Sequence, residues 1–228
     1  MKRTLVVLLV LGVAIAGGLY VIGSASSNRS DGWRPLFDGK SLAGWGALNG
    51  GAPGSGWQVQ KRGVLTSVGH TGDLVTIAEF GDFELSFDWK VSQGANSGVF
   101  YRIGPGDLDA YQTAPEYQIL DNQDAEDRHQ PNHLAGSVYD LVAPSQDLTR
   151  PARQWNKARI VVRGWHIEHW LNGQKILQVD LADSNGKALI KNSKFANAEN
   201  FARYSRGRIA LQDHGDVVSF RNIRIRDF

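Results

Sequence analysis

The chain of 228 residues contains no cysteine. This absence excludes disulfide bonds, thiolate metal ligands, cysteine nucleophiles and an anchor formed by a lipidated cysteine. A large net charge is also absent, because 25 Lys and Arg residues nearly balance 23 Asp and Glu residues. Nucleic-acid-binding proteins usually carry a basic surface, so we expect no nucleic-acid partner. Any metal ion would need ligands from His and carboxylate side chains.

Helical periodicity is nearly absent from residue 31 onward, and alternation of apolar and polar residues takes its place. The clearest example is the run from Phe83 to Val91, which alternates through nine residues. Asn172-Gly173 lies between two such runs and predicts a hairpin with a type I′ turn. The other expected strands are 57–60, 63–65, 97–103, 158–163, 166–171, 174–179, 207–211 and 217–226. Many short strands joined by turns predict an all-β sandwich or barrel.

The N-terminus has the features of an export signal. Lys2 and Arg3 precede an uncharged stretch, residues 4–23, and the small residues before position 26 suit cleavage after Ala25. The uncharged stretch is also long enough to span a bilayer, so an uncleaved inner-membrane anchor is the alternative. We therefore expect a signal peptide or anchor at 1–25, a linker at 26–32, one domain at 33–228, and a periplasmic or extracellular location. Removing Lys2 and Arg3 leaves 23 basic against 23 acidic residues.

Proline-rich sequence from residue 104 to 151 interrupts the strand pattern and predicts long loops, where functional groups often lie. Within it, Glu116-Tyr117-Gln118-Ile119-Leu120-Asp121 would place Glu116 and Gln118 on one face of a strand, and a bulge at Leu120 would bring Asp121 to the same face. The spacing resembles the E-x-D-x-x-E signature of laminarinase-type β-glucanases, with Gln118 in place of the middle carboxylate. The alternative is a half-exposed strand with solvated carboxylates.

Four histidines and two other residues are further candidates. His129 and His133 are four residues apart, but Pro131 lies between them, so a loop is expected rather than a helix. His214 is expected at the tip of a hairpin, and His169 within a strand, where a half-buried histidine with satisfied hydrogen bonds is the alternative. Arg102 ends a strand and would suit sugar hydroxyls or an oxyanion. Trp45, between two glycines, is a candidate sugar platform.

Eight short segments in order resemble the 3-keto-disaccharide hydrolase family. They are Leu36 to Leu42 with Gly44-Trp45, Asp82 to Leu85, Asn96 to Phe100, Tyr117 to Ile119, Trp155-Asn156, His169 to Gly173, Leu211 to Gly215, and Phe220 to Ile223. The resemblance covers about residues 33–228. It implies a concanavalin-A-like jelly roll of two curved antiparallel sheets, preceded here by one hydrophobic N-terminal helix. It also implies an exported enzyme that cleaves 3-keto sugars, such as 3-keto-trehalose or 3-keto-glucosides, made by a separate sugar 3-oxidoreductase.

The chemistry implied for such substrates starts from the ketone. The C3 ketone acidifies the C2 proton, its removal gives an enolate, the C1 aglycone leaves by elimination, and water adds to the enone. This needs a base at C2, donors at the C3 oxygen and an acid at the leaving group. We expect Glu116 with His133 or His214 to supply the acid and base. Substrate binding is assigned to Arg102, Gln118, Asn96, Trp45 and His169. Glu116 and Asp121, with His129 or His133, could bind a divalent ion that assists, and Asp121 and His129 are the two residues assigned to the metal alone.

Two other functions fit the same fold. A non-catalytic carbohydrate-binding module would keep the groove without the chemistry, because a fold does not determine a function. A conventional β-glucanase would need a pair of carboxylates, and the amide at Gln118 argues against it.

Overall fold

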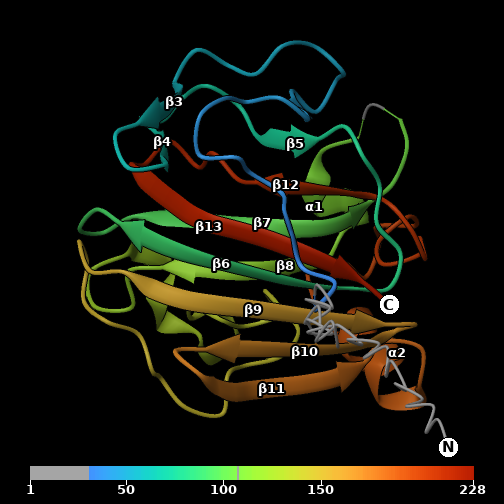
Figure 1. Cartoon of the computed structure of the whole chain (residues 1–228). Helices are drawn as coiled ribbons and strands as arrows, with labels where there is room; N and C mark the ends of the chain where they lie inside the picture. The colour runs from blue at the N-terminus through green and yellow to red at the C-terminus, as the bar shows by residue number, and fades with distance from the viewer. Residues whose placement is uncertain (1–30, 107) are drawn as a thin grey trace, which may run out of the picture. The chain divides into compact units, whose positions relative to one another are not determined.

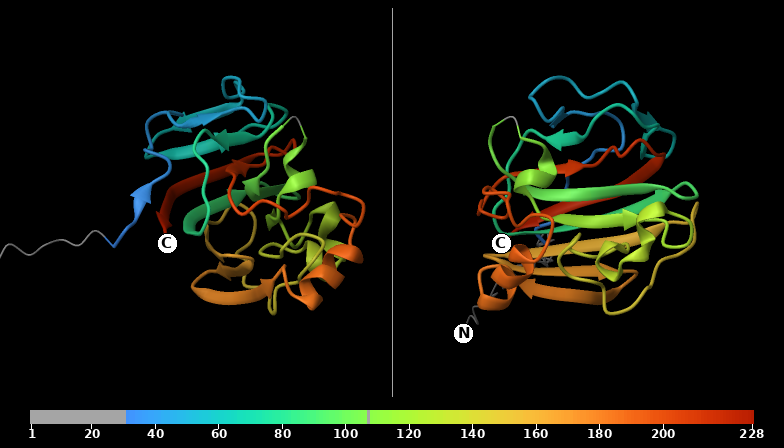
Figure 2. Two further views of the ribbon diagram at one scale, coloured as in Figure 1. Left: turned by 90° about the vertical axis from the view of Figure 1, so that its right-hand side faces the viewer. Right: turned by 180° about the vertical axis from the view of Figure 1, so that it is seen from behind.

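The computed structural model describes residues 31–106 and 108–228, which belong to one compact unit, Asp31–Phe228. Two antiparallel sheets make up this unit, and Figure 2 shows the two layers from the side. The domain is therefore the all-β sandwich that the alternating sequence predicts. The expected N-terminal helix, signal peptide or anchor lies outside the described residues. Within the described ranges, no helix is long and apolar enough to cross a membrane.

The larger sheet, sheet A, has eight strands and faces the viewer in Figure 1. Seven strands lie in the order β11 (Gln174–Asp180), β10 (His166–Leu171), β9 (Asn156–Arg163), β6 (Phe83–Val91), β13 (Val218–Asp227), β4 (Val64–Ser67) and β3 (Trp57–Gln60), and β1 (Arg34–Pro35) pairs with β13. The β10–β11 turn has positive φ at both Asn172 (48°) and Gly173 (91°), as a type I′ turn requires.

The smaller sheet, sheet B, faces the viewer in the right-hand view of Figure 2. Its five strands lie in the order β2 (Trp45–Gly46), β5 (Leu74–Thr76), β12 (Arg208–Leu211), β7 (Asn96–Ile103) and β8 (Glu116–Leu120). β12 and β13 follow each other in the chain but belong to different sheets. The segment between them, which carries His214, therefore crosses from one sheet to the other, and the prediction of a hairpin tip there is wrong.

Aromatic side chains fill the space between the sheets. Phe87 of sheet A meets Tyr117 of sheet B edge to face with ring centroids 5.7 Å apart, and Phe83 meets Tyr101 in the same way at 6.3 Å. Trp89 is also buried there, as its place in the alternating run indicates. Because both sheets contribute inward-facing residues to one core, each strand has an opposite face that is available for other roles.

Helices are few and short. They are α1 (Ala110–Thr113), α2 (Ser184–Lys191) and the 3-10 helices η1 (Glu126–His129) and η2 (Pro131–His133). α2 begins where the Asp183 carboxylate accepts a hydrogen bond from the backbone N–H of Gly186 (2.7 Å), a typical N-cap. The sequence analysis missed α1 and α2, because a helix of eight residues or fewer is too short to produce a clear periodic pattern.

Candidate active site

Glu116 and Gln118 lie on the face of β8 that points away from the core, as the alternation predicts. Tyr117 and Ile119 point the other way and are fully buried between the sheets. On the neighbouring strand, Gly98 pairs with Gln118. A Cβ atom at residue 98 would overlap the Glu116 carboxylate, so this glycine provides the space in which the carboxylate lies.

The Glu116 carboxylate is buried and has no hydrogen-bonding partner in the described part of the chain. Only 6% of the residue is exposed, and no described side chain or backbone group donates a hydrogen bond to its carboxylate. Burial raises the pKa of Glu116 to about 8. Lys194 opposes this increase, and the like charges of Asp73 and Asp127 add to it. A carboxyl group with such a pKa exchanges a proton near neutral pH, which suits general acid–base catalysis.

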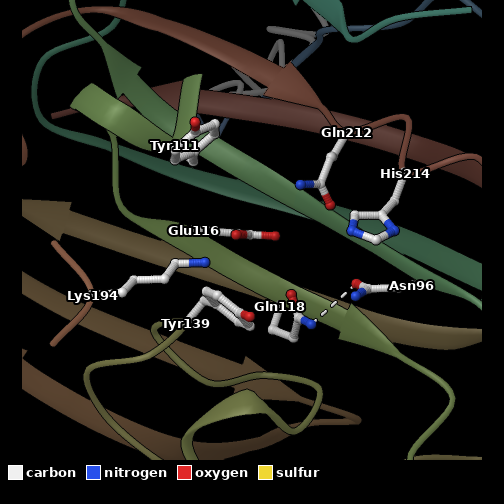
Figure 3. A pocket seen from close by; sticks show the side chains of 8 residues that line it. All are labelled: Asn96, Tyr111, Glu116, Gln118, Tyr139, Lys194, Gln212 and His214. Carbon is white, nitrogen blue, oxygen red and sulfur yellow. Dashed lines mark hydrogen bonds between the residues drawn. The ribbon is translucent and has the colours of Figure 1, made fainter. Parts of the chain in front are cut away.

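A cavity of about 280 Å³ opens above this carboxyl group (Figure 3). It is lined by Asn96 and Gln118 from the sheet, Tyr111 from α1, Tyr139, Lys194, Gln212 and His214 from loops, and Glu116 itself. In Figure 3, Lys194 lies on one side of Glu116, and Asn96 and His214 lie on the other. The cavity thus combines one titratable carboxyl group, one cation, one imidazole and three amides, which suits a polar ligand such as a sugar.

The amide groups have defined orientations. Gln118 Nε2 donates to Asn96 Oδ1 at 3.1 Å, which fixes both amides of this pair. Gln212 Oε1 is buried and has no hydrogen-bonding partner among the described residues. A buried acceptor without a donor is unfavourable, so Gln212 is suited to accept a hydrogen bond from a ligand hydroxyl.

Asp213 holds the loop that carries Gln212 and His214. Its carboxylate accepts hydrogen bonds from the backbone N–H groups of Thr71, Gly72 (2.8 Å) and Gly215 (3.1 Å). In return, its own N–H donates to Asp73 at 2.9 Å. The residues singled out at Leu211 to Gly215 therefore serve to join two loops, and they place the exposed imidazole of His214 at the cavity.

His133 lies behind the cavity wall rather than in its lining. Its Nδ1 lies 2.6 Å from Asp127 Oδ1 and its Nε2 lies 2.9 Å from Asp140 Oδ1. Asp127 also accepts from the hydroxyl of Tyr139 (2.8 Å), and Asp140 accepts from the backbone N–H of Lys194 (2.7 Å). His133 thus supports two residues of the lining, and it makes no direct contact with the cavity.

Arg102 and Trp45, which were predicted to bind substrate, point elsewhere. Arg102 donates to the backbone oxygens of Gly81 and Gly164 and to Asp82. Trp45 is 3% exposed, and its indole N–H donates to Leu36. Neither residue lines the cavity, because Arg102 has a positive φ of 61° that ends the strand alternation, and Trp45 packs inward.

His169 lies in the core between the sheets. It is fully buried, with Nδ1 donating to the Gly136 carbonyl and Nε2 accepting from the Tyr101 hydroxyl, each at 3.0 Å. Burial lowers the pKa of His169 to about 4, so the ring is neutral. The alternative considered for this histidine, a half-buried strand residue with satisfied hydrogen bonds, is right about the hydrogen bonds, but the ring is fully buried.

The two residues predicted as metal ligands do not reach the cavity. Asp121 accepts from the backbone N–H groups of Gly94 and Gln123, and no bulge turns it toward Glu116. His129 is exposed at the end of η1. Within residues 31–106 and 108–228, no group of three or more His, Asp or Glu side chains is arranged to hold a metal ion. The requirement for a divalent ion stays a prediction, to be tested by activity with and without a chelator.

Tyr111, Tyr139, Lys194 and Gln212 line the cavity but were not predicted. The first three come from loop or short helical segments without a repeating pattern. Gln212 belongs to the segment Leu211 to Gly215 that the sequence analysis singled out, and its position next to His214 was the available signal.

Comparison with known proteins gives a consistent result. A 3-keto-disaccharide hydrolase from Bacteroides thetaiotaomicron is 32% identical, over 86% of this chain and 79% of that protein. The crystal structure of a proposed glycosyl hydrolase from Parabacteroides distasonis superposes with a TM-score of 0.81 and 29% identity, over 86% of this chain and 94% of that chain. A carbohydrate-binding module, CBM66 from Bacillus subtilis, has a TM-score of 0.50 at 15% identity, over 81% of this chain and 96% of that chain, which shows the fold alone.

A family model also matches residues 32–226, which is essentially the whole described domain. This match and the identity to the Bacteroides protein confirm the resemblance drawn from the eight ordered segments. The chain therefore belongs to the family of 3-keto-α-glucoside-1,2-lyase-like domains.

Proposed function

We propose that this protein cleaves the glycosidic bond of 3-keto-glucosides, including 3-keto-disaccharides, by elimination at C1–C2 followed by hydration. The observation that carries the proposal is the Glu116 carboxyl group, which is buried and unpaired at the base of a polar cavity. The name of the Bacteroides relative and the family description support the substrate class.

Glu116 acts as the base that takes the C2 proton. Its raised pKa makes the ionised carboxylate a stronger base than an ordinary glutamate, and removal of a proton next to a ketone needs a strong base. The C–H bond pair becomes the C2–C3 double bond of an enolate, and the ketone oxygen gains the negative charge. Because Glu116 lies between Lys194 and His214 in Figure 3, C2 of the sugar would lie at the centre of the cavity.

Lys194 stabilises the enolate oxygen. Its ammonium group points toward Glu116 in Figure 3 and also lies 4.0 Å from the centre of the Tyr139 ring, which limits its movement. A cation held at the position where negative charge develops contributes more than it would in water. The same charge favours the ionised form of Glu116 before the proton transfer.

His214 donates a proton to the departing aglycone oxygen. The enolate electrons re-form the ketone as the C1–O bond breaks, which leaves a double bond between C1 and C2. Water then adds at C1 and gives one proton to His214, which restores the acid. The enolate formed by this addition takes the proton back from Glu116 at C2, so the net reaction is hydrolysis. Gln118, Asn96 and Gln212 orient the sugar hydroxyls.

The proposal extends to the cellular setting. An exported enzyme of this kind would use 3-keto sugars produced by a sugar 3-oxidoreductase and would work in the periplasm or outside the cell, with residues 4–23 as its only membrane contact if they are not removed.

The test is NMR of a 3-keto-glucoside incubated with the protein in D₂O. We expect loss of the C2–H signal and release of the aglycone. Glu116→Gln should lower both rates by roughly 10²–10⁴, because the amide cannot accept the proton. Lys194→Met should lower both rates by about 10². In His214→Gln, exchange at C2 should continue while release slows, because only the second step needs the acid.

Glu79→Gln is the matched control, since Glu79 is half-exposed and its one ion pair, with Arg206, is long (3.9 Å). Its rates should equal those of the wild type. Binding of unmodified glycans without any reaction of the 3-keto sugar would contradict the proposal and favour a carbohydrate-binding module. Release of reducing ends from a plain β-glucan would favour a conventional glucanase.

A further inference from the structure

A second cavity adjoins the candidate active site. It has a volume of about 620 Å³ and shares Asn96, Tyr139 and His214 with the first cavity. A third cavity, of about 560 Å³ near Asp73 and Asp109, shares no residue with either. The second cavity is therefore the one that continues the site on the side where His214 and Asn96 lie in Figure 3.

The size of the first cavity makes this continuation relevant. At about 280 Å³ it lies just below the usual range of ligand pockets, about 300–1,000 Å³, and leaves little room for a second sugar ring. In the proposed reaction, the aglycone leaves from C1 next to the acid. His214 lines both cavities, so an aglycone within reach of His214 extends into the second one.

The second cavity is acidic on one wall. Glu126, Asp127 and Asp216 contribute carboxylates, and none of the described residues that line it is Lys or Arg. Asp127 is held by His133 and Tyr139, and Asp216 accepts from the backbone N–H of Asn96 at 3.0 Å. Glu126 is exposed. Two of the carboxylates are thus fixed in position, while the third can turn toward a ligand.

We infer that the second cavity is the aglycone subsite and that its carboxylates select neutral or amine-bearing aglycones against carboxylate- or phosphate-bearing ones. Fixed carboxylates accept hydrogen bonds from hydroxyl and ammonium groups and repel a second anion. This inference rests on the proposed function and specifies its substrates.

The experiment compares three 3-keto-glucosides of phenols that carry a hydroxymethyl, an aminomethyl or a carboxymethyl group at the para position. The methylene group separates the charge from the ring, so the three leaving groups remain similar in acidity. We expect kcat/KM for the aminomethyl compound to exceed that for the carboxymethyl compound by about tenfold at low salt, and high salt should reduce this ratio.

Variants show which carboxylates produce the ratio of kcat/KM between the aminomethyl and carboxymethyl compounds. Glu126→Gln should reduce it about threefold. Glu126→Gln with Asp216→Asn should reduce it further, although not to one, because Asp127 keeps its charge in the cavity. Glu199→Gln removes one charge from a separate cavity near α2 and should leave the ratio unchanged. Equal kcat/KM for the three compounds, or a ratio that the double variant leaves unchanged, would overturn the inference while the proposed function stands. If the wild type cleaves none of the three compounds, the proposed function itself is overturned.

Discussion

Glu84 and Glu116 are both buried glutamates on outer faces of the sandwich, and their surroundings are opposite. Glu84, on β6 of sheet A, is 3% exposed and accepts hydrogen bonds from Arg159 (2.8 Å) and Arg226 (2.7 Å). Glu116, on β8 of sheet B, is 6% exposed and receives no hydrogen bond from the residues that the structure describes. Burial of a charge is unfavourable unless it is paired, so only Glu84 is compensated within the protein.

The difference indicates which sheet carries the function. On sheet A, the arginines beside Glu84 also stack on aromatic rings, with Arg159 3.7 Å from the Trp170 ring and Arg226 5.1 Å from the Trp33 ring. The Glu84 carboxylate and both of these arginines therefore have charged partners. On sheet B, the carboxyl group is left unpaired at the base of a cavity. A buried group without a partner destabilises the folded state, and such groups are found mainly at functional sites.

The largest expected effect is on turnover. Glu84→Gln should leave kcat/KM for a 3-keto-glucoside within about threefold of the wild type, whereas Glu116→Gln should lower it by about 10³. The measurement is the initial rate of aglycone release. A fall of similar size in both variants would show that the two carboxylates differ in geometry but not in role.

Gly98→Ala should have the next largest effect on the rate of turnover. The added methyl group meets the Glu116 carboxylate and displaces it from the cavity. A misplacement of about 1 Å can cost about 10² in rate, so we expect a loss of this order in kcat with an intact fold by circular dichroism. Gly94→Ala, at another glycine near the cavities, is not a suitable control, because φ there is 72°. Gly81→Ala has space around it and should retain activity. Full activity of Gly98→Ala would show that Glu116 does not need its observed position.

The free energy of unfolding should change in opposite directions in Glu84→Gln and Glu116→Gln. Glu84→Gln should reduce the free energy of unfolding by about 2 kcal/mol, since two arginines lose their shared anion; their exposure of 33% and 34% limits the loss. Glu116→Gln should increase it at pH 8 and above, on the order of 2–4 kcal/mol. The folded-state pKa of Glu116, about 8, exceeds the unfolded value of 4.5.

The pH dependence follows from the same values. Because the folded state holds the Glu116 proton up to about pH 8, its contribution to stability is complete below pH 4.5 and is lost as the pH rises through 8. Chemical denaturation of wild type and Glu116→Gln at several pH values separates the contribution of Glu116 to stability from that of Asp73, whose pKa burial raises to about 6. A difference between the two proteins that is constant with pH would contradict the raised pKa of Glu116.

The smallest expected effect belongs to His133. His133→Asn keeps at most one of the two contacts with Asp127 and Asp140, so the support of Lys194 weakens, and kcat/KM should fall by about tenfold. In a Lys194→Ala background, the same change should have a smaller further effect, because of the two lining residues that His133 supports only Tyr139 keeps its side chain. Independent losses in the double variant would show that His133 acts by another route.

Sequence alone predicted the strands well, because their signals are local. The alternation of 83–91 corresponds to β6, and Asn172-Gly173 forms the predicted turn. The outward direction of Glu116 and Gln118 was also predictable from the period of two residues. The contacts of Arg102 and Trp45 were not, since they depend on groups from other segments, Asp82 and the Leu36 carbonyl. For His169, the pattern allowed a strand histidine with satisfied hydrogen bonds but did not identify Tyr101 as its partner.

The contacts of Asp213 help to fix the distance between Glu116 and His214 across the cavity. The segment with His214 passes from sheet B to sheet A, while Glu116 belongs to sheet B alone. The distance between proton acceptor and proton donor therefore depends on the offset of the two layers, which the interlocking aromatic core fixes. Asp213 and the backbone of residues 71 and 72 hold the crossing segment at that offset. Sliding of one sheet relative to the other would therefore change the distance between Glu116 and His214 before any strand separates.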